Sequence, residues 1–282
     1  PISILYFCQT MRFRIFLCFF ILLLSKPLSS QEYKGLKAPF VNSSFQSFKQ
    51  GEWLKFRLHY GFFNASYATL NLEEDTLANE RVYKATAIGR TTGIARFFFK
   101  VDDVYETYFK KDIVNPIKST RNIDEGGYTK NIEINYDHFN NLANITDVKN
   151  SQFRSVSIEK NVQDLISTFY FLRNHFDIKS LRINDFIRIT IFFDAENYNF
   201  RMQFLGIEDV ETKFGTVNCF KFKPYIESGR VFRDSESLTL WVSNDENKIP
   251  IKVKAGLRIG SIEADLDQFK GLKYPFKIKI NE

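Results

Sequence analysis

The chain has 282 residues, of which 44% are hydrophobic and 16% aromatic, and its formal net charge is +6 at pH 7. This length is enough for one large domain with a substantial core. The positive charge is mild and its basic residues are spread along alternating segments, which excludes the concentrated basic face that nucleic-acid binding requires. The high content of aromatic residues favours a sheet-rich fold.

The segment that follows Met11 has the three parts of a secretion signal. Arg12 and Arg14 give a positive start, residues 15–24 are apolar without interruption, and residues 25–30 form a short polar end. The apolar run is shorter than the roughly 20 residues of a comfortable membrane span. We therefore expect residues 1–10 to be translated upstream sequence and residues 1–30 to lie outside the fold, with an uncleaved anchor as the alternative.

The cysteines agree with export but not with a disulfide or a lipid anchor. Cys18 lacks the small preceding residue and the polar following chain that lipid attachment needs, so we do not expect a lipoprotein. Without residues 1–30 a single cysteine, Cys219, is left, which cannot form an intramolecular disulfide. We expect Cys219 to be a small core residue of a strand. The net charge of the remaining chain is +3.

The segment GEWLKFRLHYGFFNASYATLNLEE, residues 51–74, changes character along its length. Its first half alternates apolar and basic residues, and after Gly61 it is apolar on both sides. We expect it to form the first strand of a sheet, with Gly61 as a bend or bulge inside it. His59 precedes the bend among basic residues and is expected on the solvent side, whereas Phe63 and Tyr67 face protein or a ligand.

Short alternating segments separated by turn-forming residues continue along most of the chain. Evenly spaced strands of this kind predict an antiparallel sheet or barrel. Gly256 and Gly260, inside a long apparent strand at 249–266, suggest bends that curve the sheet. We predict a flexible lead-in over residues 31–47 and one mainly β domain over residues 48–282, built as a curved antiparallel sheet or (half-)barrel.

One segment, at about residues 161–175, has a helical rather than an alternating pattern. Val162, Leu165, Ile166, Phe169 and Leu172 follow the i, i+3, i+4 spacing of a helical stripe. Asn161 is placed to cap the start of this helix. Because aromatic residues widen the apolar arc, we expect the helix to be largely buried, packed on the sheet or plugging the barrel.

The sequence contains no pattern of a metal site, an activated nucleophile or a phosphate-binding loop. The histidines His59, His138 and His175 stand far apart on different elements. Asp102 and Asp103 are adjacent on a strand, so they would face opposite sides and make a poor catalytic pair. We therefore expect no metal and no cofactor, and we favour a role without catalysis.

Three stretches mix aromatic residues with isolated charges: VDDVYETYF (101–109), STRNIDEGGY (119–128) and STFYFLR (167–173). Such groups form either satisfied structural pairs or a pocket with apolar walls and a few convergent polar groups. On the second interpretation the ligand-binding residues would be Phe63, Tyr67, Tyr105, Tyr108, Arg121, Glu125, Tyr128, Tyr170 and Arg173.

Six ordered motifs across residues 48–272 resemble the domain-of-unknown-function family 3108, in the version found in Bacteroidota. They are GEWLKF, VDDVYETYF, EGGY, DLISTFYFLR, FGTVNCFKFKP and LWVSNDENKIP. The resemblance implies an exported, β-rich domain of the bacterial envelope. It brings no established activity and no catalytic residues.

These observations lead to one main functional hypothesis and two alternatives. The main hypothesis is a non-catalytic periplasmic protein that binds a lipid, glycolipid or other amphipathic envelope molecule in a barrel-like cavity. A void of about 300 Å³ or more lined by Tyr and Phe would favour it. The alternatives are a structural or assembly factor that holds an envelope protein partner through its sheet surface, and an enzyme acting on envelope glycans. We expect no nucleic-acid partner and no transmembrane segment in the exported chain.

Overall fold

The structure is a computed structural model that describes residues 46–175, 177–227, 238–257 and 260–279. The predicted secretion signal, the lead-in up to residue 45 and Cys18 lie outside the described residues. None of the described helices is long and apolar enough to cross a membrane.

The first half of the chain forms eight strands and one short helix. They are β1 (Trp53–Tyr60), β2 (Phe63–Leu77), β3 (Glu80–Thr91), α2 (Gly93–Phe98), β4 (Asp102–Lys110), β5 (Pro116–Glu125), β6 (Tyr128–Asp137), β7 (Leu142–Asp147) and β8 (Gln152–Ser157). The second half begins with α3 (Leu165–His175) and a short 3-10 helix (Ile178–Ser180), and continues with β9 (Phe186–Phe193), β10 (Glu196–Thr212), β11 (Gly215–Glu227), β12 (Leu238–Ser243), β13 (Pro250–Gly256) and β14 (Ser261–Lys270).

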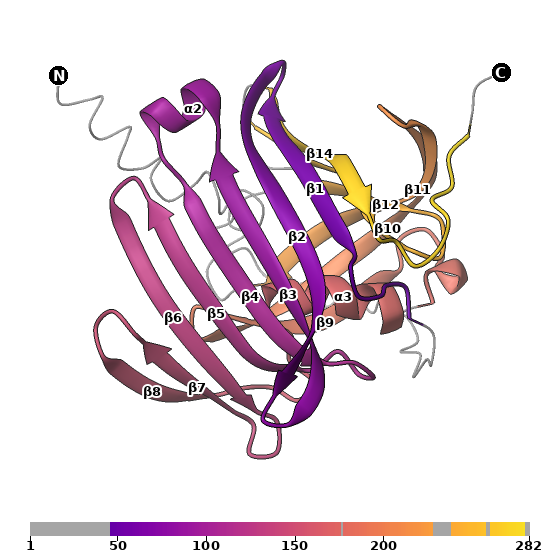
Figure 1. The fold of residues 1–282 in the computed structure, drawn as a ribbon. Helices are drawn as coiled ribbons and strands as arrows, with labels where there is room; N and C mark the ends of the chain where they lie inside the picture. Colours follow the sequence, from indigo (N-terminus) through magenta and orange to yellow (C-terminus); the bar gives the residue numbers. More distant parts are fainter. Residues whose placement is uncertain (1–45, 176, 228–237, 258–259, 280–282) are drawn as a thin grey trace, which may run out of the picture.

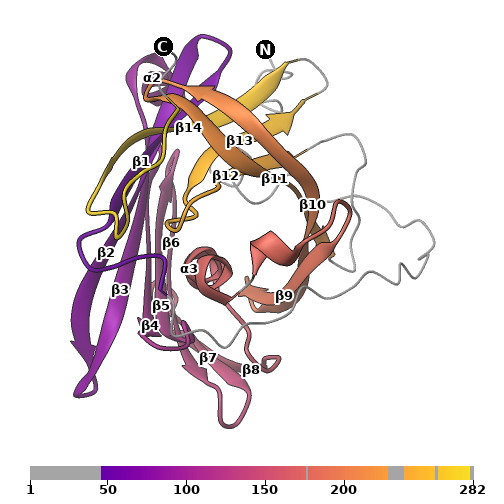
Figure 2. The ribbon, with the colours of Figure 1, turned by 90° about the vertical axis from the view of Figure 1, so that its right-hand side faces the viewer.

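All fourteen strands belong to one antiparallel sheet that curls without closing. The strand order is β8-β7-β6-β5-β4-β3-β2-β1-β14-β13-β12-β11-β10-β9, so β1 and β14 join the two halves and β8 and β9 are the free ends. Figure 1 shows the first half as a broad face, and Figure 2 shows the second half wrapping over it around α3. The prediction of a mainly β protein with a curved antiparallel sheet and one main helix is confirmed.

The segment 51–74 forms two strands rather than one, and the expected bend at Gly61 is a chain reversal. Gly61, with a φ of +55°, and the fully exposed Phe62 form a two-residue turn between β1 and β2. The two strands are antiparallel neighbours in the sheet, with Leu58 opposite Ser66 and a register shift before His59. The apolar character changes after Gly61 because a second strand begins there. Aromatic neighbours on both sides concealed the turn.

The long apparent strand at 249–266 is likewise a hairpin, made by β13 and β14. The chain reverses between Gly256 and Ser261, which pair with each other across the hairpin. Gly260 has a φ of +73° in this turn, a conformation that favours glycine. The glycines that were expected to bend a strand therefore end one strand and precede the next.

Helix α3 lies within the curve of the sheet and fills it (Figure 2). Its Tyr170 is fully buried, with ring centroids 4.8 Å from Phe48 and 5.3 Å from Phe109. The N-terminal cap is Asp164, which accepts hydrogen bonds from the backbone N–H groups of Ile166 and Ser167 at 2.9 and 2.8 Å. The expected cap, Asn161, lies three residues before the residue that caps the helix. The predicted burial of the helix is confirmed.

A second core cluster lies where β1 and β14 face β11, β12 and β13, and Phe169 of α3 packs against it. Leu54, Phe56 and Leu58 of β1 point into it, and Cys219 is fully buried there. Burial raises the pKa of the Cys219 thiol to about 12, so this thiol stays protonated and unreactive at neutral pH. The expectation of a structural core cysteine agrees with this position.

Candidate functional site: a pocket at the seam of the sheet

The segment that leads into α3 bridges the two edge strands of the sheet, β8 and β9, over part of their length. Gln163 donates its backbone N–H to Thr190 O at 3.0 Å and accepts from Phe192 N at 2.7 Å, so this segment lies along β9. Ile158 and Val162 of the same segment pack with Phe192 against β6 and β7. The seam between β8 and β9 is therefore sealed beside Phe192, and next to this seal it is open.

The open part of the seam holds a pocket of about 470 Å³, which we call the seam pocket. This volume is within the range of small-molecule sites in proteins. The pocket is larger than the void that would favour a carrier, but its walls are aliphatic and charged rather than rich in Tyr and Phe. Its lining residues are Arg121, Lys130, Ile132, Ile134, Ile145, Asp147, Gln152, Phe153, Arg154, Asp194 and Ala195.

The apolar floor of the seam pocket follows from strand pairing. Ile134 of β6 is directly opposite Ile145 of β7, and Ile132 is opposite Arg121 of β5. Directly opposed residues share a face of the sheet, so these side chains all point inward. Ile132, Ile134 and Ile145 are buried and form one continuous apolar surface.

The charged wall of the seam pocket is centred on Arg121. Its side chain is 8% exposed, and its Nη2 donates to Asp194 Oδ1 at 2.6 Å. Lys130 Nζ donates to the same oxygen at 3.1 Å. Burial acts to raise the pKa of Asp194, but the charges and hydrogen bonds of Arg121 and Lys130 hold it below its ordinary value, so Asp194 is ionised at neutral pH.

Unused hydrogen-bonding capacity remains on Arg121. Its buried Nε has no hydrogen-bond partner among the described residues. The face of its guanidinium lies 4.5 Å from the centroid of the Phe193 ring. A buried donor without a partner costs free energy, and this cost is recovered when a ligand supplies an acceptor.

The charges of the seam pocket do not cancel. Arg121, Lys130 and Arg154 outnumber the two carboxylates, Asp147 and Asp194, so the lining carries a net charge of +1. Asp147 is occupied by its own turn, where it accepts from Asn150 N at 3.0 Å and from Asn150 Nδ2 at 2.8 Å. Arg154 is exposed in β8 at the rim. The pocket therefore suits a molecule with an apolar part and an acidic group.

Three of the predicted ligand-binding residues lie together on β4 and β5. Arg121 lines the seam pocket, and Tyr105, opposite Arg121 in the register, lines an adjoining space of only about 20 Å³. Glu125 lies at the end of β5 next to the fully buried Asp103. Burial, together with the charge of Asp103, raises the pKa of Glu125 to about 7.

Two other predicted residues, Tyr170 and Arg173, belong to the core around α3. Arg173 donates to both carboxylate oxygens of Glu52 at 2.6 and 2.7 Å, and it also bonds the backbone oxygens of Ser47 and Asn247. Tyr170 is enclosed by aromatic rings. These two are structural residues of the helix-filled region and do not line the seam pocket.

The remaining predicted residues lie on the outside or at an end of the sheet. Tyr67 and Tyr108 are on the outer face, beneath Lys55 and Lys84 at 4.0 and 5.4 Å from the ring centroids. Phe63 begins β2 and is 38% exposed, and Tyr128 begins β6 and is 53% exposed. Tyr67 is directly opposite Arg57, so it shares the outer face with the basic residues of β1 and lies beneath Lys55 instead of facing a ligand cavity.

Sequence reasoning missed Lys130, Arg154 and Asp194. Asp194 lies in the turn of the β9–β10 hairpin, and its contact with Arg121 spans 73 residues of sequence. A cation on the inward side of a strand was the available signal: Arg154 is opposite Ile145, and Lys130 is opposite Ile123. Only the inward orientation of these cations distinguishes them from ordinary surface residues.

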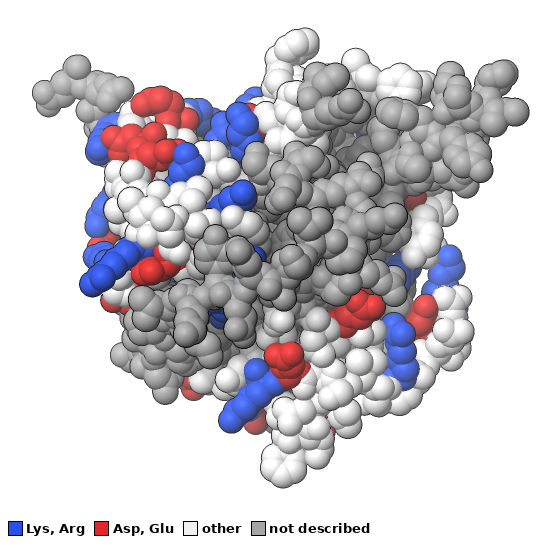
Figure 3. Space-filling view, turned by 180° about the vertical axis from the view of Figure 1, so that it is seen from behind, with Lys and Arg blue, Asp and Glu red and all other residues white. Residues whose placement is uncertain are grey.

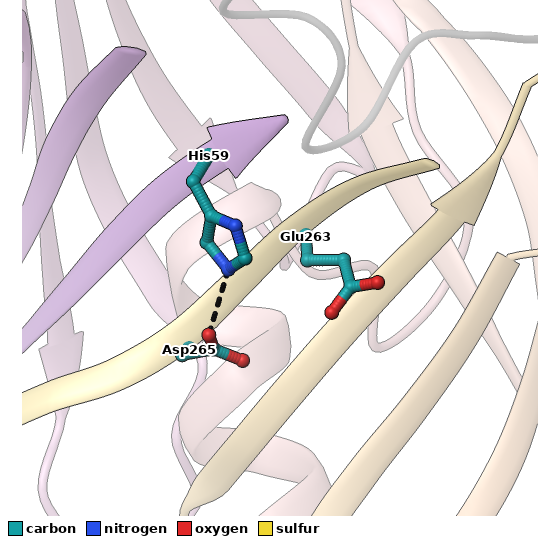
Figure 4. Close-up of side chains that lie close together, drawn as sticks. All are labelled: His59, Glu263 and Asp265. Carbon is teal, nitrogen blue, oxygen red and sulfur yellow. Dashed lines mark hydrogen bonds and ion pairs between the residues drawn. The ribbon is translucent and has the colours of Figure 1, made fainter. Parts of the chain in front are cut away.

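A cluster of His59, Glu263 and Asp265 on the outer face has the residue types of a metal site (Figure 4). Both ring nitrogens of His59 face oxygen acceptors at 2.7 Å, Gly61 O and Asp265 Oδ2, and only the doubly protonated ring satisfies both. Lys252 Nζ lies 2.6 Å from Glu263 and 3.5 Å from Asp265, where it takes the place of a cation. Burial acts to raise the pKa of Glu263, but hydrogen bonds from Lys252 and Lys254 lower it to about 2. The cluster is an ion-pair network, and we assign no metal to it.

Charges of both signs are mixed on the back of the molecule. Lys and Arg lie beside Asp and Glu over the described part of this face (Figure 3). Many of the described exposed charges are paired, for example Lys277 with Glu246 at 2.8 Å and Lys279 with Asp209 at 2.6 Å.

Three solved structures are similar to the chain at low sequence identity. A β-barrel-like protein of the domain of unknown function DUF1849 from Brucella abortus has a TM-score of 0.53 at 10% identity, over 80% of this chain and 99% of that protein. A candidate lipoprotein from Parabacteroides distasonis has a TM-score of 0.33 over 81% of this chain and all of its own, at 10% identity. A candidate exported protein with a YmcC-like fold from Bacteroides fragilis has a TM-score of 0.30 over 83% of this chain and 99% of its own, also at 10% identity.

A search of curated proteins finds no match to the chain. The Brucella protein shows that the half-barrel is a fold shared by proteins of very different sequence. The family model of proteins of unknown function DUF3108 matches residues 55–267, from β1 into β14. The chain therefore belongs to the DUF3108 family.

Proposed function

We propose that the protein is a non-catalytic envelope protein that binds an amphipathic molecule with an acidic group in the seam pocket. The observation that carries the proposal is the position of Arg121 at the edge of an isoleucine-lined pocket of about 470 Å³, as a buried cation whose Nε has no partner among the described residues. The signal-like segment at residues 11–30 supports export, and hence a periplasmic location.

The charge of the lining indicates how the ligand is held. An apolar part would lie on Ile132, Ile134 and Ile145, and its acidic group would accept from Arg121 and reach Lys130 or Arg154 at the rim. Asp194 holds Arg121 and Lys130 in place without taking all of their donors. A neutral amphiphile of the same length would offer Arg121 only an uncharged acceptor, and hence a weaker hydrogen bond than a carboxylate gives.

Calorimetric titration with dodecanoate and with dodecanol tests this proposal, on protein recovered from the periplasm of an expression host. We expect dodecanoate to bind at least about tenfold more tightly, the difference that one charge-assisted hydrogen bond provides. Lys130→Gln and Arg154→Gln should each weaken dodecanoate binding. Lys110→Gln is the matched control, because Lys110 is an exposed lysine of β4 paired with exposed Glu80.

Equal binding of the two amphiphiles, or equal effects of Lys130→Gln and Lys110→Gln, would contradict a role for the charged wall. Native mass spectrometry of the same preparation gives an independent check, because a bound envelope molecule adds a defined mass. A homogeneous unliganded protein that binds neither probe would contradict the proposal as a whole.

An assembly factor is the second candidate, and the free edge of β8 is the observation that favours it. β8 ends the sheet, so one row of its backbone donors and acceptors is open to an added strand. Phe153 of β8 is 68% exposed. Cross-linking through a photoreactive residue at position 153 would support this candidate if it captures one defined envelope protein, and oppose it if it captures none.

A further inference from the structure

Four large apolar side chains project into solvent at one end of the molecule. Phe62 of the β1–β2 turn is fully exposed, and Ile94, Phe97 and Phe98 of α2 are 64%, 87% and 75% exposed. The backbone N–H of Thr92, just before α2, donates to Ala65 O of β2 at 3.1 Å, which places the two elements side by side. We call these four residues the apolar tip; α2 and the β1–β2 turn stand together at the top of Figure 1.

Helix α2 exposes its apolar side chains to solvent, whereas an ordinary surface helix buries them. None of its six residues is buried, so it contributes nothing to the core. It is held instead by Arg96, which forms a two-pronged pair with Asp102 at 3.0 and 2.7 Å. Polar contacts thus fix the helix while its apolar side chains face outward, which is how exposed patches at interaction sites are built.

The shape of the apolar tip indicates a soft partner. Its side chains stand on two separate elements, the β1–β2 turn and α2. Phe97 and Phe98 meet edge to face at 5.5 Å between ring centroids. In the neighbouring β5–β6 turn, Gly126 N donates to the oxygen of Lys100, just after α2, at 2.8 Å, and the half-exposed Tyr128 follows this turn. A convex group of aromatic side chains needs no complementary groove when the partner is the interfacial layer of a bilayer.

The charges around the apolar tip indicate anionic lipid. Arg90, Arg96 and Lys100 have side chains that are 63%, 41% and 47% exposed. They pair with Asp102 and Asp124, whose side chains are only 25% and 38% exposed, so the cations are the more accessible charges at this surface. A basic rim around exposed aromatic residues is complementary to negatively charged headgroups.

We propose that the apolar tip docks the protein on a membrane surface by inserting Phe62, Phe97 and Phe98 into the interfacial layer of an anionic bilayer. The basic rim then lies at the headgroups. The docking does not depend on the seam pocket, so the two proposals can fail separately.

Co-sedimentation with vesicles tests the docking, with equal parts of phosphatidylglycerol and phosphatidylcholine, on protein recovered from the periplasm. We expect the triple variant Phe62→Ser/Phe97→Ser/Phe98→Ser to partition at least about tenfold more weakly than the parent. Vesicles of phosphatidylcholine alone, and added salt, should each weaken binding of the parent. Phe139→Ser is the matched control, since Phe139 is 93% exposed in the β6–β7 turn at the opposite end of β6.

Thermal unfolding and dodecanoate binding should be unchanged in the triple variant, because the replaced side chains touch neither the core nor the seam pocket. Vesicle binding equal to that of the parent would overturn the proposal. So would an equal loss in Phe139→Ser. Concentration-dependent dimers of the parent that the triple variant abolishes, without any vesicle binding, would assign the apolar tip to a second copy of the chain and also overturn it.

Discussion

Two arginines on the inner side of the same sheet are used in opposite ways. Arg173 of α3 is 3% exposed, and four of its N–H groups bond Glu52, Ser47 and Asn247. The side chain of Arg121 at the seam is 8% exposed and pairs with a partly exposed carboxylate, and its Nε has no hydrogen-bond partner in the described part of the chain. Where a helix fills the curve of the sheet, the protein uses its buried charge for its own stability. Where the sheet does not close, the described residues leave part of the hydrogen-bonding capacity of the arginine unused.

Removing each arginine is the strongest way to test this contrast. Arg173→Met should cost about 3–5 kcal/mol of unfolding free energy, because it leaves Glu52, 1% exposed, as an unpaired buried charge. Arg121→Met should cost only about 1 kcal/mol, because Asp194 is 39% exposed and keeps Lys130. Urea unfolding followed by circular dichroism measures both values.

The double variant Arg173→Met/Glu52→Met serves as the control for the ion pair. Removing both charges should restore part of the loss, since no buried charge is left unpaired. Similar costs for Arg173→Met and Arg121→Met would show that the two sites are equally structural, and would weaken the assignment of Arg121 to a ligand.

The carboxyl pair of Asp103 and Glu125 makes the stability of the folded protein depend on pH. The pKa of Glu125 is raised in the folded protein from 4.5 to about 7, so the folded state holds an extra proton between these values. Stability therefore falls as the pH rises through this window, and the loss is complete above pH 7. Its size is about 1–3 kcal/mol, allowing for the coupling between the two groups.

Glu125→Gln should flatten the decline in unfolding free energy between pH 5 and pH 8. Glu133→Gln is the matched control, because a hydrogen bond from Lys118 lowers the pKa of Glu133 and moves its effect below this window. Each variant removes a single carboxyl group from the parent, so the difference between the slopes of the two variants isolates Glu125. Parallel slopes for Glu125→Gln and the parent would show that the carboxyl pair is not buried as described.

The parts of the fold that depend on local patterns were predictable from the sequence. Period-two alternation identified the sheet, and the i, i+3, i+4 stripe identified α3 and its burial. The turn at Gly61 was missed because Tyr60, Phe62 and Phe63 surround it, in place of the polar residues that usually mark a hairpin.

The candidate site was only partly predictable, because it depends on contacts between distant segments. Arg121 was identified as a charge in an apolar neighbourhood, but its partner Asp194 lies 73 residues away. Arg173 had the same sequence signature, and its partner Glu52 lies 121 residues away in the opposite direction. Whether such an arginine is fully satisfied or available depends on the folded surroundings of its partner, which no local pattern contains.

The smallest expected effect concerns the backbone of the turn beside the seam pocket. Asp194 and Ala195 have φ values of +46° and +65°, a pair that non-glycine residues adopt at a cost. Ala78 and Asn79 adopt the same kind of turn between β2 and β3, far from the pocket, with φ values of +51° and +65°. Ala195→Gly and Ala78→Gly should each raise the unfolding free energy by roughly 0.5–1 kcal/mol, because glycine removes the strain.

Thermal unfolding of the two glycine variants and dodecanoate titration together distinguish strain from ligand positioning. If the turn only connects two strands, both variants gain stability and bind dodecanoate as the parent does. If the rigid turn holds Asp194 against Arg121 for the ligand, Ala195→Gly should gain stability and still bind more weakly, while Ala78→Gly keeps its affinity. A loss of stability in both variants would contradict the turn geometry itself, since glycine can adopt these φ values without steric cost.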